Sequence, residues 1–141
     1  MNKKLNYQLE AQVGHLLRRA NQRHTALFAE MFNEYGLTAL QFAALMKLRE
    51  FKELSQNQLG RLTAMDPNTI QGVVKRLQQR GLVERHPHAA DRRRVTLVLS
   101  QDGVETAARL VAVGLQISAQ TLSPLTQAEQ RQFLDLLERL A

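Results

Sequence analysis

Cysteine is absent from the 141 residues, which excludes disulfide bonds, thiol nucleophiles and cysteine metal sites. Tryptophan is also absent and tyrosine occurs only twice, so little is available for stacking on the bases of single-stranded RNA. No apolar run approaches the roughly 20 residues of a membrane-spanning helix. The basic N-terminus lacks the apolar stretch of a signal peptide. We therefore expect a cytoplasmic protein with no membrane partner.

Residues for catalysis or for holding a cofactor are equally scarce. The seven glycines are scattered and form no phosphate-binding loop, and no nucleophile elbow is present. No residue set offers a nucleophile and a base at a workable spacing, so the sequence predicts no enzyme and no cofactor. His86 and His88 suggest a metal site, but no third ligand lies nearby in the sequence. We interpret both histidines as DNA contacts or exposed side chains and predict no metal.

The best specified element is a helix that begins at Pro67. Asp66 can cap its N-terminus, and Gly81 suits the left-handed residue after its end. One face carries an apolar stripe at helical spacing, made of Ile70, Val73, Val74 and Leu77. The other face has no carboxylate and offers amides, a gap and two cations, which suit the base edges and phosphates of a DNA groove. The alternative is an ordinary solvated helix face. The predicted DNA contacts on this helix are Asn68, Thr69, Gln71, Gly72, Lys75, Arg76 and Gln79.

A second short helix precedes this one. Ser55 and Gln58 have the spacing of a capping box, and Leu59 and Leu62 are its expected inward positions. A turn of about three residues, 63–65, then leads to Asp66. This is the length expected of a helix-turn-helix.

Two short strands follow, at Leu82–Arg85, which is half apolar, and at Val95–Leu99, where Val95, Leu97 and Leu99 lie on one side. A hairpin beside a helix-turn-helix predicts a winged helix. The cations of such a wing can reach phosphates or a narrow minor groove. The predicted DNA contacts of the wing are Asp91, Arg92, Arg93 and Arg94.

Positive charge is concentrated in this part of the chain. Residues 75–94 contain seven cations and two anions, a difference of +5, against a net charge of +6 for the whole chain. A random solubilising surface would not concentrate its charge in this way, so the distribution favours a nucleic-acid partner.

The segment 55–103 resembles the winged helix-turn-helix of the MarR family of bacterial transcription regulators. The wing pattern of that family is Asp-x-Arg, five residues, Leu-Thr, two residues and Gly. Here it reads Asp91-Arg92-Arg93, five residues, Leu99-Ser100, two residues and Gly103. Ser100 replaces the usual threonine and keeps the hydroxyl that can cap the next helix. The resemblance implies that Arg93 enters the minor groove at the wing tip and that Asp91 holds it there.

The rest of the chain is predicted to form helices. We expect a long helix over 13–35, stopped by Gly36, then a buried helix capped by Thr38. Further helices run from Ser100 to about Gln120 and from a capping box at Thr126. The predicted fold is mainly α with a small β-hairpin wing, as one MarR-like domain over 1–141. Residues 37–100 form its winged helix-turn-helix, and 5–36 and 101–141 form dimerisation helices.

The terminal helices are rich in leucine, so they pack either within one chain or with a second copy. The resemblance implies a homodimer. Two copies can read a two-fold, pseudo-palindromic operator in double-stranded DNA, with half-sites about one helical turn apart.

Candidate ligand residues lie on the first helix. His24 falls at the centre of its apolar stripe, Arg19 and Arg23 lie on the edge, and His15 lies nearer the outer side. An arginine could bind an aromatic carboxylate while the imidazole reaches a hydroxyl or ring nitrogen. The alternative is a core histidine beside surface arginines. Asp66 caps the helix that begins at Pro67. It is also a further ligand candidate, because it lies where the helix that contacts DNA would meet the helices that bind the ligand.

The sequence thus predicts a dimeric, sequence-specific DNA-binding repressor. More loosely, residues 65–85 resemble the subset of the family that represses aromatic-acid catabolism, which implies release from the operator by a small aromatic acid. In that mechanism a ligand, wedged between the first two helices and the reading domain, favours a different spacing of the recognition helices. The alternative is a small-molecule-binding or metal-binding sensor without sequence-specific DNA binding.

Overall fold

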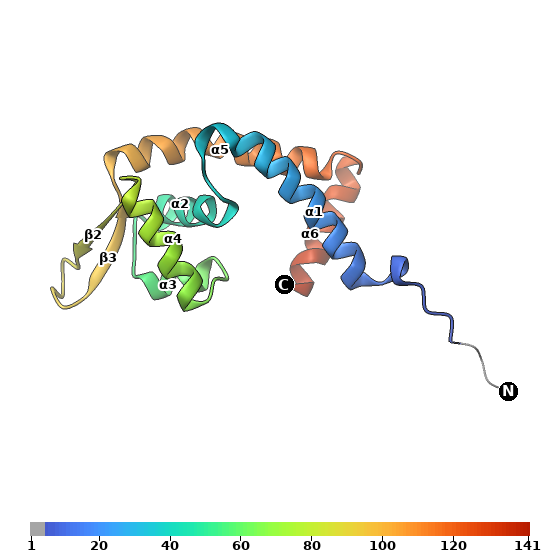
Figure 1. Ribbon diagram of the computed structural model, residues 1–141, viewed down its shortest axis with the longest axis horizontal. Coiled ribbons are helices and arrows are strands. Elements are labelled where there is room, and N and C mark those ends of the chain that lie inside the picture. Colours follow the sequence, from blue (N-terminus) through green and yellow to red (C-terminus); the bar gives the residue numbers. More distant parts are fainter. Residues whose placement is uncertain (1–4) are drawn as a thin grey trace. The chain divides into compact units, whose positions relative to one another are not determined.

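A computed structural model describes residues 5–141, which are mainly helical with a small antiparallel sheet (Figure 1). The helices are η1 (Leu9–Ala11), α1 (Val13–Phe32), η2 (Asn33–Tyr35), α2 (Ala39–Phe51), α3 (Gln56–Leu62), α4 (Pro67–Gln79), α5 (Gln101–Leu122) and α6 (Gln127–Leu140), where η denotes a 3-10 helix. The strands are β1 (Glu53–Leu54), β2 (Val83–Pro87) and β3 (Val95–Leu99). The predicted fold class, a winged helix-turn-helix with helices at both ends, is confirmed. No helix within 5–141 has both the length and the apolar character needed to cross a membrane.

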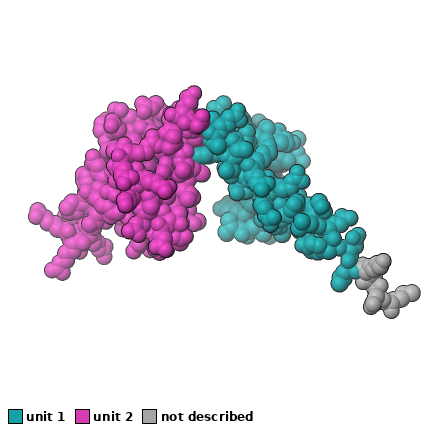
Figure 2. Space-filling model, viewed as in Figure 1, with its two compact units in different colours: residues 1–31, 116–141 teal, residues 32–115 magenta. Residues whose placement is uncertain are grey.

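The chain forms two compact units (Figure 2). The terminal unit comprises residues 1–31 and 116–141, and the winged-helix unit comprises residues 32–115. Of the 19 buried hydrophobic residues among 5–141, only Phe28 and Ile117 belong to the terminal unit. The hydrophobic core of a single chain therefore lies almost wholly in the winged-helix unit.

Helix α2 lies at the centre of the winged-helix unit, as its sequence predicts. Ala44, Leu45 and Leu48 are fully buried, and the ring of Phe42 packs edge-on against Phe32 with 5.0 Å between ring centroids. Leu40 departs from the expectation of an all-round buried helix, because 45% of it is exposed. Helices α2, α3 and α4 contact one another and provide the base on which the wing is mounted.

The sheet has the strand order β1-β3-β2 and is antiparallel throughout. In the wing hairpin, β2 pairs with β3 from Val83 opposite Leu99 to Pro87 opposite Val95. The sequence predicted this hairpin but not β1, which is only two residues long. Strand β1 joins the start of α3 to the wing, because Leu54 pairs with Leu97 at the buried root of β3.

Local capping decides where most helices begin. Complete capping boxes start α2 at Thr38, α3 at Ser55 and α6 at Thr126, as predicted. Gly36 adopts the left-handed conformation with φ of +60° after η2, which gives the turn that the sequence assigned to it. One predicted inward position is wrong, since Leu59 is fully buried but Leu62 is 41% exposed.

Candidate nucleic-acid interface

Helix α4 is specified by its cap and by its buried face. The Asp66 carboxylate accepts hydrogen bonds from the backbone N–H of Thr69, at 2.8 Å, and from the Thr69 hydroxyl, at 2.9 Å. These two bonds hold the pKa of the Asp66 carboxyl below its ordinary value, because they favour the charged form. Pro67 occupies the first turn, and the predicted apolar stripe is buried in full: Ile70, Val73, Val74 and Leu77.

The opposite face of α4 is open to solvent and carries no carboxylate. Its exposed residues are Asn68, Gln71, Gly72, Lys75, Arg76 and Gln79. Thr69 is half-buried and engaged in the cap, so it differs from the other residues predicted on this helix. A Cβ added at Gly72 would meet no atom within 4 Å, so this residue leaves room on the surface rather than in the core. The face can therefore approach a nucleic-acid groove closely.

Removing the cap gives a first test of how α4 is specified. Asp66→Ala should lower the melting temperature by about 3 °C, because the first turn of α4 loses its side-chain acceptor. The folded-state pKa of Asp66 is lowered, so its stabilising effect is present above the ordinary carboxyl pKa and is lost as pH falls through the lowered value. Asp66→Asn is the matched control, since asparagine caps helices but does not titrate. Thermal melts from pH 7 to pH 2.5 check both changes, and equal melting temperatures for the alanine variant and the wild type would contradict this role.

The wing loop is ordered by its own main chain. The N–H of His88 donates to the carbonyl of Arg94 at 2.8 Å and closes the loop. The Asp91 carboxylate accepts from the backbone N–H of Arg93 at 3.0 Å, so it fixes the main chain and not the guanidinium. Arg92, Arg93 and Arg94 are exposed, and none has a side-chain hydrogen bond or ion pair within the described residues. Three uncompensated cations therefore stand at the end of an ordered hairpin.

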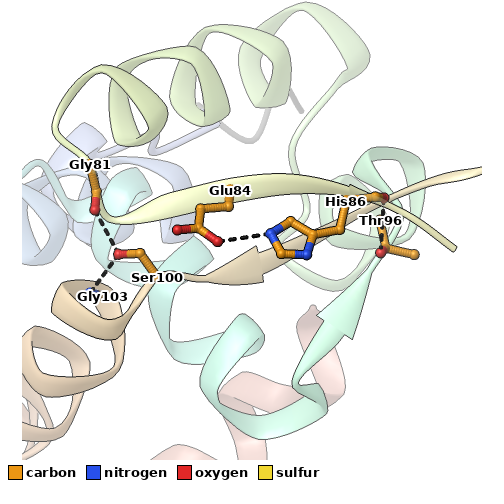
Figure 3. Close-up of polar contacts among 6 residues, drawn as sticks. All are labelled: Gly81, Glu84, His86, Thr96, Ser100 and Gly103. Carbon is orange, nitrogen blue, oxygen red and sulfur yellow. Dashed lines mark hydrogen bonds and ion pairs between the residues drawn. The ribbon is translucent and has the colours of Figure 1, made fainter. Parts of the chain in front are cut away.

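The root of the wing ties the end of α4 to the start of α5 (Figure 3). The Ser100 hydroxyl donates to the carbonyl of Gly81 at 2.6 Å and accepts from the N–H of Gly103 at 3.0 Å, as Figure 3 shows. A Cβ at Gly103 would lie 2.0 Å from the carbonyl oxygen of Leu82, so only glycine fits there. Ser100 thus performs the predicted capping and also anchors the wing.

The two histidines of the wing each face one carboxylate. His86 Nε2 lies 2.8 Å from Glu84 Oε2 on the same strand (Figure 3), and His88 Nε2 lies 3.9 Å from Glu53 Oε1. Within 5–141 no group of three or more potential ligands could hold a metal ion. The histidines are therefore ion-pair partners when protonated.

Arg80 has a structural role that sequence reasoning missed. Its guanidinium donates to the carbonyls of Tyr35 and Gly36, both at 2.7 Å, and so ties the end of α4 to the turn before α2. These partners are 44 and 45 residues away, and no local pattern signals such a contact.

The side chain of Arg85 also forms hydrogen bonds within the protein. It donates to Gln56 of α3 at 2.7 Å and to Gln78 of α4 at 3.3 Å. One side chain of β2 therefore connects the wing to both helices of the helix-turn-helix. The cations of residues 75–94 left without a protein partner in the described chain are Lys75, Arg76, Arg92, Arg93 and Arg94.

The predicted ligand residues of α1 lie in the terminal unit and have different surroundings. Arg23 donates to the carbonyls of Gln120 and Thr121 at the end of α5, so its guanidinium is occupied. Arg19 is exposed and has no partner among residues 5–141. His15 is half-buried, with a buried Nδ1 that has no hydrogen-bond partner. Asp66 belongs to the winged-helix unit.

His24 borders a cavity of about 370 Å³ formed by α1, α5 and α6. This volume falls within the range of small-molecule sites. Its lining is mostly apolar and comprises Leu17, Ala20, Asn21, His24, Ser118, Thr121, Leu122, Phe133, Leu134 and Leu137. Of the predicted ligand residues, only His24 is in this lining.

The open face of α4 and the arginine-tipped wing define a winged helix-turn-helix of the DNA-binding kind. Comparison with known proteins identifies the family. The MarR family model matches residues 35–94. The HTH-type transcriptional repressor NicR of Pseudomonas putida is 39% identical over 134 residues, which cover 95% of this chain and 85% of NicR. The chain therefore belongs to the MarR family of transcription regulators.

Two solved structures extend the similarity over almost the whole fold. A probable transcriptional regulator from Pseudomonas aeruginosa is 46% identical with a TM-score of 0.88, covering 95% of this chain and 100% of that chain. BpsR of Bordetella bronchiseptica is 38% identical with a TM-score of 0.90, covering 96% of each chain. The DNA binding of BpsR is regulated by 6-hydroxynicotinic acid.

Proposed function

We propose that this protein is a homodimeric repressor that binds an operator in duplex DNA and is released from it by a small aromatic ligand. The observation that carries the DNA-binding part is the carboxylate-free face of α4 in one compact unit with the wing arginines. Five cations there have no protein partner in the described chain, and phosphates are the partners that such cations take in DNA complexes. The membership of the MarR family and the similarity to the repressor NicR support the same function.

The terminal unit supports the homodimer. It holds only two of the buried hydrophobic residues but exposes many large ones. These are Leu5, Tyr7, Leu9, Val13, Leu16, Leu17, Phe133, Leu134, Leu136 and Leu140. So much exposed apolar surface on a small unit indicates an interface. A second copy is the partner that a two-fold operator requires, because it supplies a second recognition helix.

The hydrogen bonds of His24 support a ligand that carries a donor group. The Thr121 hydroxyl donates its one proton to the carbonyl of Ile117 at 2.8 Å. It must therefore accept from His24 Nδ1, which lies 2.9 Å away. In the neutral imidazole Nε2 is then an acceptor, suited to a ligand hydroxyl or ring N–H. Of the two arginines that the sequence predicted as ligand residues, Arg19 has the free guanidinium for a carboxylate, since Arg23 is occupied.

Ligand release tests the regulatory part. Phenolic, benzoic and pyridine carboxylates are screened for a rise in melting temperature, and the hits are titrated into the protein–DNA complex. His24→Ala should weaken the releasing ligand about tenfold, the effect of losing one hydrogen bond worth about 1.4 kcal/mol. Glu138→Ala, an exposed position of α6 outside the cavity lining, is the control. If release stayed intact in both His24→Ala and Arg19→Ala, this placement of the ligand would be wrong.

A further inference from the structure

A second cavity, of about 430 Å³, lies within the winged-helix unit between α3 and the loop end of the wing. Asn57, Gln58 and Arg61 line it from α3. His88 and Arg94 line it from the wing. The sequence singled out Arg94 as a wing cation but gave no DNA-binding role to the α3 residues. No part of this cavity belongs to the exposed face of α4.

The polar groups around this cavity are mainly hydrogen-bond donors. Arg61 and Arg94 have no side-chain partner within the described residues, and no carboxylate is among the lining groups. The oxygen of the Gln58 amide accepts from the N–H of Ser55, so its NH₂ group is left to donate. The Nδ1 atom of His88 accepts from the backbone N–H of Ala90, at 3.1 Å.

It follows that a neutral His88 carries its proton on Nε2. That atom lies 3.9 Å from Glu53 Oε1, the carboxylate with which His88 pairs in the described chain. Two guanidinium groups outweigh this single, 53% exposed carboxylate. A cavity with unpaired guanidinium groups and spare N–H donors favours an occupant that is anionic and rich in acceptor oxygens, such as a phosphate.

The cavity lies where a DNA strand would pass between the helix-turn-helix and the wing. The wing loop, α3 and the N-terminal end of α4 all lie toward the lower edge of the winged-helix unit in Figure 1. A helix in the major groove and a hairpin in the adjoining minor groove have one sugar–phosphate strand between them. That strand must cross the surface that connects the two elements. Arg85 holds this connection together, because it bridges β2 to Gln56 and Gln78.

We propose that this cavity seats a backbone phosphate of the DNA strand that passes between the wing and the helix-turn-helix, with Arg61 and Arg94 as its two cations. The inference rests on the proposed DNA-binding function and adds α3 to the interface. A phosphate contact of this kind positions the protein on the duplex and carries no base sequence. It should therefore contribute equally to binding of operator and of unrelated DNA.

Charge-removing variants test the site. Arg61→Gln and Arg94→Gln should each weaken binding about three- to tenfold, on an operator duplex and an unrelated duplex alike. Each should also reduce the slope of log K against log salt concentration by about one for each protomer bound, hence by about two for a dimer on DNA. Fluorescence anisotropy at several salt concentrations measures both quantities. Arg109→Gln removes the same charge from exposed α5 and should change neither. Arg61→Lys keeps the charge and should retain the slope, which separates the loss of charge from a loss of folding.

The outcomes separate this inference from the proposed function. If Arg61→Gln kept the full affinity for duplex DNA and the full salt slope while Arg93→Ala weakened binding, that result would contradict the phosphate site in this cavity. It would leave the proposed DNA binding intact. If the wild-type protein did not bind duplex DNA at low salt concentration, the proposed function itself would be wrong. A calorimetric titration of the DNA-free protein with inorganic phosphate should show no saturable binding below about 10 mM, since one phosphate between two exposed cations gains little in water. Saturable binding in that range, lost in Arg61→Gln, would identify a free-anion site and overturn the assignment to DNA.

Discussion

A Leu16→Glu/Leu136→Glu variant should be monomeric and should bind operator DNA at least about a hundredfold more weakly than the wild type. Both leucines are about half exposed in the single chain, at 51% and 47%, so glutamate at either position can be solvated without unfolding the protomer. In a dimer that buries these side chains, two charges per chain would be desolvated without a partner. Losing the second copy removes the gain from bivalent binding, which is about 10²–10⁴ in affinity.

Sedimentation equilibrium gives the mass of the variant, and anisotropy titration gives its affinity. An operator duplex for this purpose can be selected with the wild type from a pool of random sequences. Val104→Glu is the matched control, because Val104 is also 50% exposed but belongs to the winged-helix unit. A double variant that remained a dimer would place the interface elsewhere. A monomer with wild-type affinity would remove the dimer from the proposed mechanism.

Arg93→Ala should lower operator affinity at least tenfold and leave the melting temperature unchanged. The Arg93 guanidinium has no partner within the described protein, so its loss removes no contact that stabilises the fold. The main chain of the loop should persist, because Asp91 binds the N–H of residue 93 and not its side chain. A guanidinium inserted in a narrow minor groove is stabilised by the enhanced negative potential there.

The matched control for this variant is Arg131→Ala, which removes one exposed arginine from α6. Both variants are compared with the wild type at the same ionic strength, because affinity for DNA depends steeply on salt. Equal affinities for Arg93→Ala and the wild type would mean that the wing tip makes no energetically important contact with DNA.

Local features of the fold could be predicted because their causes lie within a few residues. The caps at Ser55, Asp66 and Thr126 each involve a partner three residues ahead. The apolar stripe of α4 has the period of one helix face, which the sequence displays directly. The start of α4 and the bounds of β3 were therefore predictable to the residue, whereas β2 runs from Val83 to Pro87 and not from Leu82 to Arg85.

The remainder depends on contacts between distant segments. Strand β1 exists because Leu54 meets Leu97, and a two-residue segment shows no period of its own. Arg80 and Arg85 were included in the count of cations over residues 75–94, but each binds protein groups 7 to 45 residues away. Charge counting therefore overestimates the number of cations available to DNA.

The candidate ligand site shows the same limit. The helical stripe placed His24 inward and Arg23 on its edge, but it could not show that α5 ends beside them. Arg23 binds carbonyls 97 and 98 residues further along the chain, and His24 meets Thr121. The tautomer of His24, and hence the kind of ligand group it would accept, follows only from that tertiary contact.

The salt dependence of duplex binding by the wild-type protein tests most directly whether the α4 face and the wing together bind DNA. Each protomer offers five cations without a protein partner in the described chain, and each phosphate they neutralise contributes about −0.9 to the slope of log K against log salt concentration. A slope steeper than about −4 is expected between 50 and 200 mM salt, with tight binding at the low end. A slope near zero, or no binding to duplex DNA at low salt, would contradict the assignment of this surface to DNA.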